Sequence, residues 1–242
     1  MSFSDGKPKI IGMIPAYNCA HLLKKAYEQV PKEYFDDIIV IDDGSTDDTF
    51  AVAKTLPAKA FTHEHSGYGG NIKFAIRKAL ELGADYMIEI HGDGQYDPAE
   101  LTTLLAHMEP SVGLVNGYKV KRSDPFHRIV IGKVYNAMAR RLFGISLRDI
   151  DCDFRLLRRT LLEQARLQYD SGVICVEMVY KLERLSCRVV EVQVSHYPRV
   201  AGRSQFFRWR AILTTLAQLA SIYFSRWEAP AARRDVAELN PK

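Results

Sequence analysis

The chain alternates between short apolar runs and longer stretches in which apolar residues recur at helical spacing. The short runs predict strands at residues 9–14, 37–41, 58–62, 86–90, 113–116 and 189–194. The longer stretches predict helices at residues 20–30, 46–56, 70–82, 98–107, 126–143 and 175–185. Strands that alternate with helices in this way favour a mostly parallel sheet covered by helices, so we expect an α/β protein with a single domain.

Polar side chains follow two of the predicted strands where each strand ends. Asp42 and Asp43 come directly after the run 38–41, and the segment 91–97, with Asp93 and Gln95, follows the run 87–90. The carboxyl ends of parallel strands meet at one edge of a sheet, and ligands bind there. Carboxylate and amide oxygens suit a hard divalent cation, and such a cation commonly serves phosphates. The sequence therefore predicts a site for a nucleotide phosphate and a metal ion.

Helix capping explains only part of the first of these strand ends. Ser45 or Thr46 is a suitable N-cap for the next helix, and Asp47 and Asp48 favour its positive end. Capping does not explain the acids at the strand end itself. Asp43 is suited to accept hydrogen bonds from the N–H groups of a nucleobase or from a ribose hydroxyl.

At the second strand end, Asp93 and Gln95 stand at alternate positions, so both oxygens can face one ion. His91 suits a nitrogen ligand, a ribose contact or an ordinary strand-end residue. Asp97 is better explained as the cap of the helix that Pro98 opens. We therefore predict that Asp93 and Gln95 bind the metal, with His91 as a further candidate.

Three other segments offer groups for an anionic ligand. The glycine-rich turn 66–71, with Gly69 and Gly70, lets the backbone approach a ligand and opens a helix with unpaired N–H groups, although such turns are more often structural. Aspartates at positions 149, 151 and 153 would share one face of an extended segment, where they need a nearby cation such as Arg155, Arg158 or Arg199. The loop 199–205 carries arginines suited to phosphates, unless it is an ordinary surface loop.

Composition narrows the class of protein. The chain has 242 residues, 47% of them apolar, which is enough for one large domain, and its net charge of +4 does not indicate a nucleic-acid binder. Its four cysteines form no CxxC pair, so we expect reduced thiols in a cytoplasmic protein and no zinc site. No segment resembles a signal peptide or a spanning helix, and residues 229–242 are predicted to form a loose tail.

Two of the predicted helices are amphipathic. Residues 206–227 repeat apolar and aromatic side chains at helical spacing, with arginines near both ends. Such a stripe more often faces a protein core, but aromatic residues and arginines at the ends also fit a helix that lies at a membrane interface. Residues 126–143 carry a second, basic amphipathic pattern.

Taken together, these segments resemble the family 2 glycosyltransferases with a GT-A fold, and within them the dolichol-phosphate mannose synthases and bacterial polyprenyl-phosphate glycosyltransferases. The likeness runs from about Lys9 to Ala217. Residues 15–18 resemble the P-x-Y-N motif, residues 39–49 the V-x-D-D-G-S-x-D-x-T element, and residues 91–95 the D-x-D-x-Q metal element. Residues 149–155 resemble D-x-T-S-G-F-R, Glu177 matches the acid of the following helix, and residues 191–204 resemble E-V-P…R-x-x-G-x-S-K. The GT-A domain would span residues 1–228.

The resemblance implies roles for individual residues. The backbone of Ile41 and the carboxylate of Asp43 would meet the base, and Arg199 and Lys119 would pair with phosphates. The substrate-binding residues that we predict are Pro15, Tyr17, Asn18, Ile41, Asp43, Gly69, Gly70, His91, Gly92, Lys119, Arg155 and Ser204. The predicted metal ligands, for Mg²⁺ or Mn²⁺, are Asp93, Gln95 and His91, and the predicted catalytic residues are Asp93, Asp149 and Arg199.

The chain also departs from the family pattern. His91 replaces the first acid of the metal element, Cys19 replaces the acid after P-x-Y-N, and Gln205 replaces the closing lysine. The T-S-G stretch is replaced by residues 151–153. A carboxylate beside guanine would accept its paired N–H groups, which Cys19 does poorly, whereas uracil offers one N3–H that Asp43 can accept. We therefore favour a UDP-sugar over GDP-mannose as the donor.

The expected reaction is an inverting, metal-dependent transfer of a sugar from a nucleotide diphosphate sugar to a polyprenyl or dolichyl phosphate. A lipid phosphate is already ionised at neutral pH, so positioning suffices, whereas a hydroxyl acceptor would need a base such as Asp149 or Asp151. The two amphipathic helices favour the lipid phosphate. We expect a cytoplasmic protein, peripheral at the inner face of the membrane, with a membrane partner subunit or a homo-oligomer as further partners.

Three alternatives remain. The same fold can transfer to a saccharide or another hydroxyl acceptor. A nucleotidyltransferase needs a glycine-rich, basic opening loop, which residues 15–21 lack. A non-catalytic nucleotide-sugar-binding subunit is suggested by His91, Cys19 and Gln205, but the retained Asp43 and Asp93 speak against it.

Overall fold

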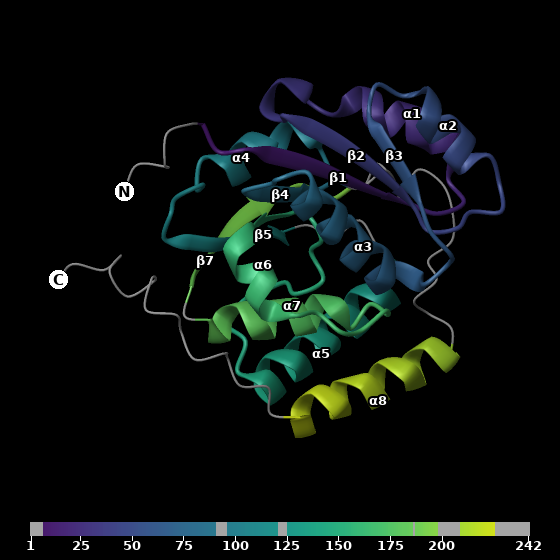
Figure 1. Ribbon diagram of the computed structural model, residues 1–242. Helices are drawn as coiled ribbons and strands as arrows, with labels where there is room; N and C mark the ends of the chain where they lie inside the picture. Colours follow the sequence, from purple (N-terminus) through teal and green to yellow (C-terminus); the bar gives the residue numbers. More distant parts are fainter. Residues whose placement is uncertain (1–6, 91–95, 121–124, 186, 198–208, 226–242) are drawn as a thin grey trace.

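The computed structural model describes residues 7–90, 96–120, 125–185, 187–197 and 209–225 of the chain, and these form one sheet with helices on both faces (Figure 1). The strand order is β3-β2-β1-β4-β6-β5-β7. The strands are β1 (Ile10–Ala16), β2 (Asp37–Asp42), β3 (Lys59–Thr62), β4 (Tyr86–Glu89), β5 (Val112–Lys119), β6 (Arg155–Arg158) and β7 (Arg188–Val194). Only β6 runs antiparallel to its neighbours, β4 and β5. The predicted α/β fold with a mostly parallel sheet is confirmed.

The helices bury both faces of the sheet. On one face, α1 (Ala20–Gln29), α2 (Thr49–Thr55) and α4 (Leu101–Leu105) pack against one set of strand residues, including Ile10 and Ile14. On the other face, Ile11 and Met13 belong to the core that the remaining helices share. These are α3 (Gly67–Glu81), α5 (Phe126–Phe143), α6 (Arg159–Ala165), α7 (Ile174–Arg184) and α8 (Trp209–Ser225). Because both faces are covered, the strands appear in the sequence as unbroken apolar runs.

Two elements are not predicted by the apolar pattern. Strand β6 has only Leu156 and Leu157 between two arginines, so its apolar run is too short to reveal a strand, and α6 follows it without a break. Three predicted helices also start or end differently, and one of them is the helix expected from residue 70, which begins at Gly67. Residues 98–107 form a 3₁₀ turn (Pro98–Glu100) and the short α4, and the helix expected from residue 46 begins only at Thr49. A further 3₁₀ turn covers Lys32–Tyr34.

Helix α8 forms an outer layer beyond α5 and α7, drawn in yellow at the bottom of Figure 1. Its stripe of apolar residues is divided. Leu219 and Ile222 are buried in the core, whereas other large apolar side chains on the helix are exposed, as described below. The interpretation of this stripe as simply core-facing is therefore only partly right. Within the described ranges, no helix is long and apolar enough to cross a membrane.

Candidate functional site

The strands that run in the direction of β1 all end at one edge of the sheet, and the predicted site residues gather there. Tyr17 and Asn18 follow β1, Asp43 follows β2, and Lys119 ends β5. Strand β4 ends at the same edge, but residues 91–95, which come next in the sequence, lie outside the described residues. The edge carries two groups of acids, one around Asp43 and one between residues 149 and 153.

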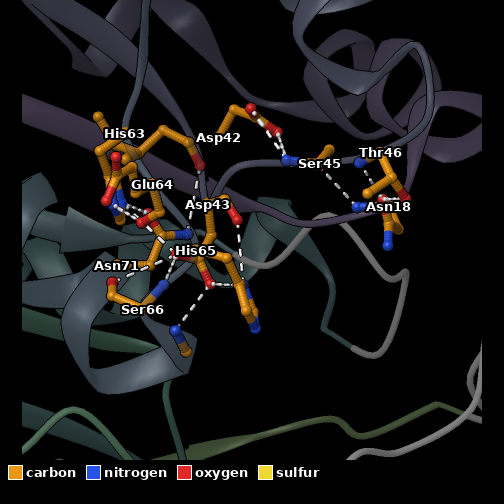
Figure 2. Close-up of polar contacts among 12 residues, drawn as sticks. Asn18, Asp42, Asp43, Ser45, Thr46, His63, Glu64, His65, Ser66 and Asn71 are labelled. Carbon is orange, nitrogen blue, oxygen red and sulfur yellow. Dashed lines mark hydrogen bonds and ion pairs between the residues drawn. The ribbon is translucent and has the colours of Figure 1, made fainter.

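Asp43 is buried, with 2% of its surface exposed, and its carboxylate fixes the start of α3 (Figure 2). One oxygen accepts from the backbone N–H of Ser66 at 2.8 Å, and the other accepts from the N–H of Gly67 at 3.0 Å. The second oxygen also lies 2.9 Å from Nδ1 of His65. The Nε2 atom of His63 is 3.7 Å from the first oxygen. The carboxylate is thus held by two N–H groups at the start of the helix and by the imidazole of His65.

These contacts change what Asp43 can offer to a ligand. The sequence predicts that its carboxylate binds a nucleobase, but both oxygens already accept hydrogen bonds from the turn 65–67. The group on the open side of this cluster is His65, whose side chain is 53% exposed. The ring of Tyr17 stacks on His65, with 4.4 Å between ring centroids and an interplanar angle of 19°. Asp43 therefore holds an aromatic pair at the edge of the sheet.

Asn18 joins the loop after β1 to the loop after β2 (Figure 2). Its backbone has a positive φ of 47°, a conformation that asparagine tolerates better than most residues. Its side-chain oxygen accepts from the N–H of Thr46 at 2.9 Å, and its own N–H donates to Ser45 Oγ at 2.9 Å. The expectation that Ser45 or Thr46 caps the next helix is therefore wrong, because both hydroxyl residues contact Asn18 instead.

The acids on either side of Asp43 are structural. Asp42 accepts from the hydroxyl of Thr62 at 2.8 Å and from the N–H of Ser45 at 3.3 Å. Asp47 accepts from the N–H of Thr49 at 2.9 Å and of Ala20 at 3.2 Å, so it holds the first turns of two helices. Burial raises the pKa of Asp47, but the hydrogen bonds from Thr49 and Ala20 outweigh this effect and lower the pKa overall.

The interpretation of Asp47 as a helix-start residue is confirmed by these contacts. The same interpretation of Asp48, as an acid at the positive end of the helix, agrees with its position. Asp48 occupies the N-cap position of α2, but its side chain makes no capping hydrogen bond.

Because Gly69 and Gly70 have no side chains, another segment of the protein backbone packs against the start of α3 and fills the space there. Their N–H groups donate to the carbonyl of Asp170 at 2.8 and 3.2 Å. A Cβ atom on Gly69 would lie 2.5 Å from the carbonyl oxygen of Ser171. The N–H groups that sequence analysis assigns to a ligand are thus already used, which corrects that expectation.

The segment that meets these glycines is itself held by Glu177. This fully buried carboxylate accepts from the N–H of Gln168 at 2.8 Å and of Tyr169 at 3.1 Å. It also pairs with Lys181 at 2.7 Å, one turn further along α7. The family acid at this position therefore fixes the loop that supports α3.

The second acidic group lies between residues 149 and 153, and each of its acids has a different partner. Asp149 pairs with Lys119 at 3.5 Å, Asp151 accepts from Asn136 at 3.1 Å, and Asp153 pairs with Arg155 at 3.1 Å. The segment is a turn and not an extended strand, which begins only at Arg155. The prediction that the three acids share one face through strand alternation is therefore wrong.

The two cations of this group are engaged by protein acids and carbonyls. Lys119 has a side chain that is only 3% exposed, and its ammonium donates to the carbonyl of Asp151 at 3.0 Å. Arg155 is 1% exposed and donates to the carbonyls of Ile150 at 3.2 Å and Cys152 at 2.7 Å. The sequence predicts that both residues contact the substrate, whereas in the structure both of them bind the turn 149–154. Arg158, considered as a further cation, donates to the carbonyl of Pro110.

Glu89 is a buried acid of the site that sequence analysis misses. It is the last residue of β4, is 1% exposed, and accepts from the hydroxyl of Tyr68 at 2.7 Å. Burial lowers the pKa of Arg155, but the thiol of Cys175 and the carboxyls of Asp153 and Glu89 outweigh burial and raise it overall. The signal that could have identified Glu89 is an acid inside an otherwise apolar run, directly before the acidic loop.

Several predicted site residues lie outside the described residues. These are His91, Gly92, Asp93, Gln95, Arg199 and Ser204. Their assignment to the metal, the donor and catalysis stays a prediction. Among the described residues there is no group of three or more histidine, cysteine or acidic side chains that could hold a metal ion. Pro15 and Ile41, which are described, lie in β1 and β2 beside this edge.

Comparison with known proteins agrees with this architecture. The family model described as "Glycosyl transferase family 2" matches residues 13–166. A polyprenol monophosphomannose synthase of Mycolicibacterium smegmatis is 27% identical over 212 residues, which cover 80% of this chain and 79% of that protein. An undecaprenyl-phosphate mannosyltransferase of Micrococcus luteus is 27% identical over 214 residues, covering 81% and 87%.

A solved structure shares the fold. The crystal structure of glucosyl-3-phosphoglycerate synthase from Mycobacterium tuberculosis, in complex with Mn²⁺, UDP and glucosyl-3-phosphoglycerate, matches with a TM-score of 0.67. The match covers 93% of this chain and 82% of that chain at 17% sequence identity. This likeness supports the GT-A-like architecture.

Proposed function

Because the chain belongs to glycosyl transferase family 2, we propose that it transfers a sugar, with inversion, from a nucleoside diphosphate sugar to a polyprenyl phosphate. Relatives named for polyprenol and undecaprenyl phosphate support the acceptor. The observation that carries the donor is the anchored pair of Tyr17 and His65, which Asp43 holds at the carboxyl edge of the sheet. Ligands of such sheets bind at this edge.

The nucleobase lies against Tyr17 and His65 in this proposal. Aromatic rings supply a flat surface for a base, and Tyr17 is 37% exposed. Asp43 acts by holding His65 and the turn that starts α3, because both of its oxygens are bound to residues 65–67. UDP is favoured as the nucleotide, and the UDP complex of the structural neighbour is consistent with this choice.

A divalent cation belongs to the proposed site. Asp93, Gln95 and His91 would hold it, because they follow β4 at the edge where Asp43 lies. Mg²⁺ or Mn²⁺ at this point neutralises charge that develops on the leaving diphosphate. A histidine ligand favours Mn²⁺, which is the softer of the two ions. Arg199 would contact the same diphosphate.

The acceptor decides whether a general base is required. A polyprenyl phosphate is ionised at neutral pH, so the protein needs only to position it. Asp149 is the base candidate for a hydroxyl acceptor. One of its oxygens is paired with Lys119, and the other is buried and has no hydrogen-bond partner among the described residues. We favour the phosphate acceptor, because it requires no proton transfer to this buried pair.

The donor assignment is tested by thermal shift and calorimetry with UDP and GDP, each with and without Mn²⁺. A ligand of the native state raises the melting temperature by mass action, so UDP with Mn²⁺ should give the largest rise. His65→Ala should weaken UDP binding by roughly tenfold through loss of the stacked ring. His107→Ala, at the opposite edge of the sheet, should bind UDP as the parent protein does. Tighter binding of GDP than of UDP would exclude the uridine assignment.

The reaction is tested by incubating the protein with a UDP-sugar panel and either a polyprenyl phosphate or a set of hydroxyl acceptors. We expect a glycosyl phosphate lipid, and no product with Asp93→Ala. Product only with hydroxyl acceptors would instead support a saccharide or small-molecule transferase. Tight nucleotide binding without turnover on any acceptor would point to a non-catalytic subunit.

A further inference from the structure

Helix α5 presents apolar side chains to solvent along one face. Phe126, Val130 and Val134 recur at every fourth position, and they are 80%, 42% and 63% exposed. Residues spaced in this way lie on one side of a helix. Ile131 on the same helix is also exposed. We call this set the α5 face. Large apolar side chains grouped in this way on a protein surface mark a contact surface.

Helix α8 also exposes large apolar side chains beside its buried residues. Leu213 and Leu216 are about half exposed at 57% and 47%, and Phe224 is 78% exposed, while Leu219 and Ile222 point into the core. We call the exposed set the α8 face. The two helices meet near their C-terminal ends, where Tyr223 of α8 contacts Phe143 of α5 edge to face, with 6.3 Å between ring centroids. Figure 1 shows both helices at the side of the molecule away from β2 and β3.

The charge of both helices has one sign. Neither the segment 126–143 nor the segment 209–225 contains an aspartate or a glutamate. Helix α5 adds exposed basic residues at Lys133, Arg140 and Arg141. Aromatic and aliphatic side chains beside basic residues, without acids, are the pattern of a helix that lies in an anionic lipid interface.

The position of α5 connects this surface to the candidate site. Six residues separate the start of the helix from the end of β5, where Lys119 contacts the acidic turn 149–154. The helix itself reaches this turn at Asn136, which donates to the carboxylate of Asp151 at 3.1 Å and accepts from the N–H of Ile150 at 2.8 Å. A surface that begins beside a site for a lipid-linked phosphate is well placed to bring that site to the lipid.

We propose that the α5 and α8 faces dock on an anionic bilayer, with the apolar side chains in the interfacial region and the basic residues on the lipid phosphates. This inference rests on the proposed function, because a polyprenyl phosphate is presented by a membrane. A second copy of the chain is a poorer occupant. A symmetric contact would place the same basic, acid-free helices against each other, and like charges repel.

The test is co-sedimentation of the full chain with vesicles. The protein should bind vesicles of equimolar phosphatidylcholine and phosphatidylglycerol, and bind vesicles of phosphatidylcholine alone at least about tenfold more weakly. The paired substitution Lys133→Glu and Arg141→Glu should reduce binding to the anionic vesicles by at least about tenfold. Val134→Ser combined with Phe224→Ser should reduce it by a similar factor, because both side chains lose their apolar contact with lipid.

A matched control separates this surface from net charge alone. Lys24→Glu with Lys25→Glu changes the net charge by the same amount, but these exposed lysines lie on α1, on the opposite face of the sheet. This variant should bind vesicles within about threefold of the parent protein, since α1 faces away from the bilayer. All these positions are exposed, so melting temperatures should stay close to that of the parent.

Three results would overturn the proposal. One is a parent protein that stays in solution with the anionic vesicles. Another is an equal loss of binding in the α1 control and the α5 variant. The third is a dimer in solution that Val134→Ser with Phe224→Ser dissociates, which would make the surface an interface between two copies.

Transfer to a short, water-soluble isoprenyl phosphate separates this inference from the proposed function. Turnover on that acceptor without vesicle binding rejects only the docking surface, and vesicle binding without turnover on any acceptor rejects only the transferase assignment.

Discussion

Asp43 and Asp149 are both buried acids at the carboxyl edge of the sheet, yet they are stabilised by different kinds of partner. Asp43 is held by backbone N–H groups at the start of α3 and by the half-exposed imidazole of His65. Asp149 is held by the side chain of Lys119, which is itself buried. The first arrangement leaves a polar ring at the surface, and the second encloses both charges. The region around Asp43 is therefore suited to exchange partners with a ligand, whereas the turn 149–154 is suited to hold a shape.

The largest effect on stability is expected when the turn 149–154 loses its buried cation, Arg155. Arg155→Met should lower the free energy of unfolding by about 3–5 kcal/mol, because Asp153 and two backbone carbonyls lose a buried partner. Urea unfolding measures this change. Arg159→Met is the control. Arg159 forms an exposed pair with Glu163 one helical turn away, and its loss should cost no more than about 0.5 kcal/mol. Equal losses in the two variants would show that burial does not distinguish them.

The pair of Lys119 and Asp149 should behave as a unit. Lys119→Met alone leaves a buried carboxylate without its cation and should cost about 2–4 kcal/mol of unfolding free energy. The double variant with Asp149→Asn should cost less than the sum of the two single variants, by about 1–2 kcal/mol. A double-mutant cycle with urea unfolding measures this coupling. Strict additivity would mean that the two side chains do not stabilise each other.

Substitution of Asp43 should lower the stability less than substitution of Arg155 or Lys119, but it should weaken ligand binding more. Asp43→Asn turns one acceptor into a donor that faces the N–H groups of Ser66 and Gly67, so we expect a loss of about 1–3 kcal/mol in unfolding free energy. The affinity for UDP should also fall, because the aromatic pair loses its anchor. Asp48→Asn changes an exposed acid nearby that makes no capping hydrogen bond, and it should leave both quantities unchanged. Calorimetry and urea unfolding together distinguish the two outcomes.

The smallest effect concerns pH and Asp47. The pKa of this carboxyl in the folded protein lies below its unfolded value, because the hydrogen bonds from Thr49 and Ala20 outweigh burial. Its contribution is therefore fully present above the unfolded pKa of about 4 and is lost as the pH falls through the folded pKa. Because Asp47 is exposed, Asp47→Asn should cost no more than about 1 kcal/mol at neutral pH, and the cost should shrink in acid. A cost that does not change with pH, measured by urea unfolding, would contradict this assignment.

The sequence predicts the sheet and its functional edge well, because both depend on local pattern. The strand that ends at Asp42 and the acid that follows it are visible as an apolar run and a break. Strand β6 is not visible in this way, since half of its residues are arginines, and the fold pairs Arg155 with Asp153 and Arg158 with the carbonyl of Pro110. Glu89 is hidden for the same reason. Its partner, Tyr68, belongs to another element, and no local pattern joins them.

The roles of individual site residues are predicted less well than their location. Gly69 and Gly70 look like a ligand-binding turn, but their packing against Asp170 and Ser171 depends on a loop far along the chain. Lys119 looks like a phosphate ligand, but its partners are the turn 149–154. In both cases the residue type correctly indicates the kind of partner, which is an anion for Lys119 and a closely packed backbone for the glycines. Only the fold determines which group of the protein is that partner.

The contact between α3 and the loop 168–171 also has a consequence for how the chain acquires its structure. The ribosome releases β1 to β4 and α3 well before it releases α7, which carries Glu177. Until that helix emerges, the first turn of α3 lacks the carbonyl that receives its N–H groups, and the loop that would supply it lacks its buried anchor. The N-terminal half is thus not expected to mature as an autonomous unit, and nascent chains that stop before residue 177 should remain sensitive to protease even though most of the sheet has been made.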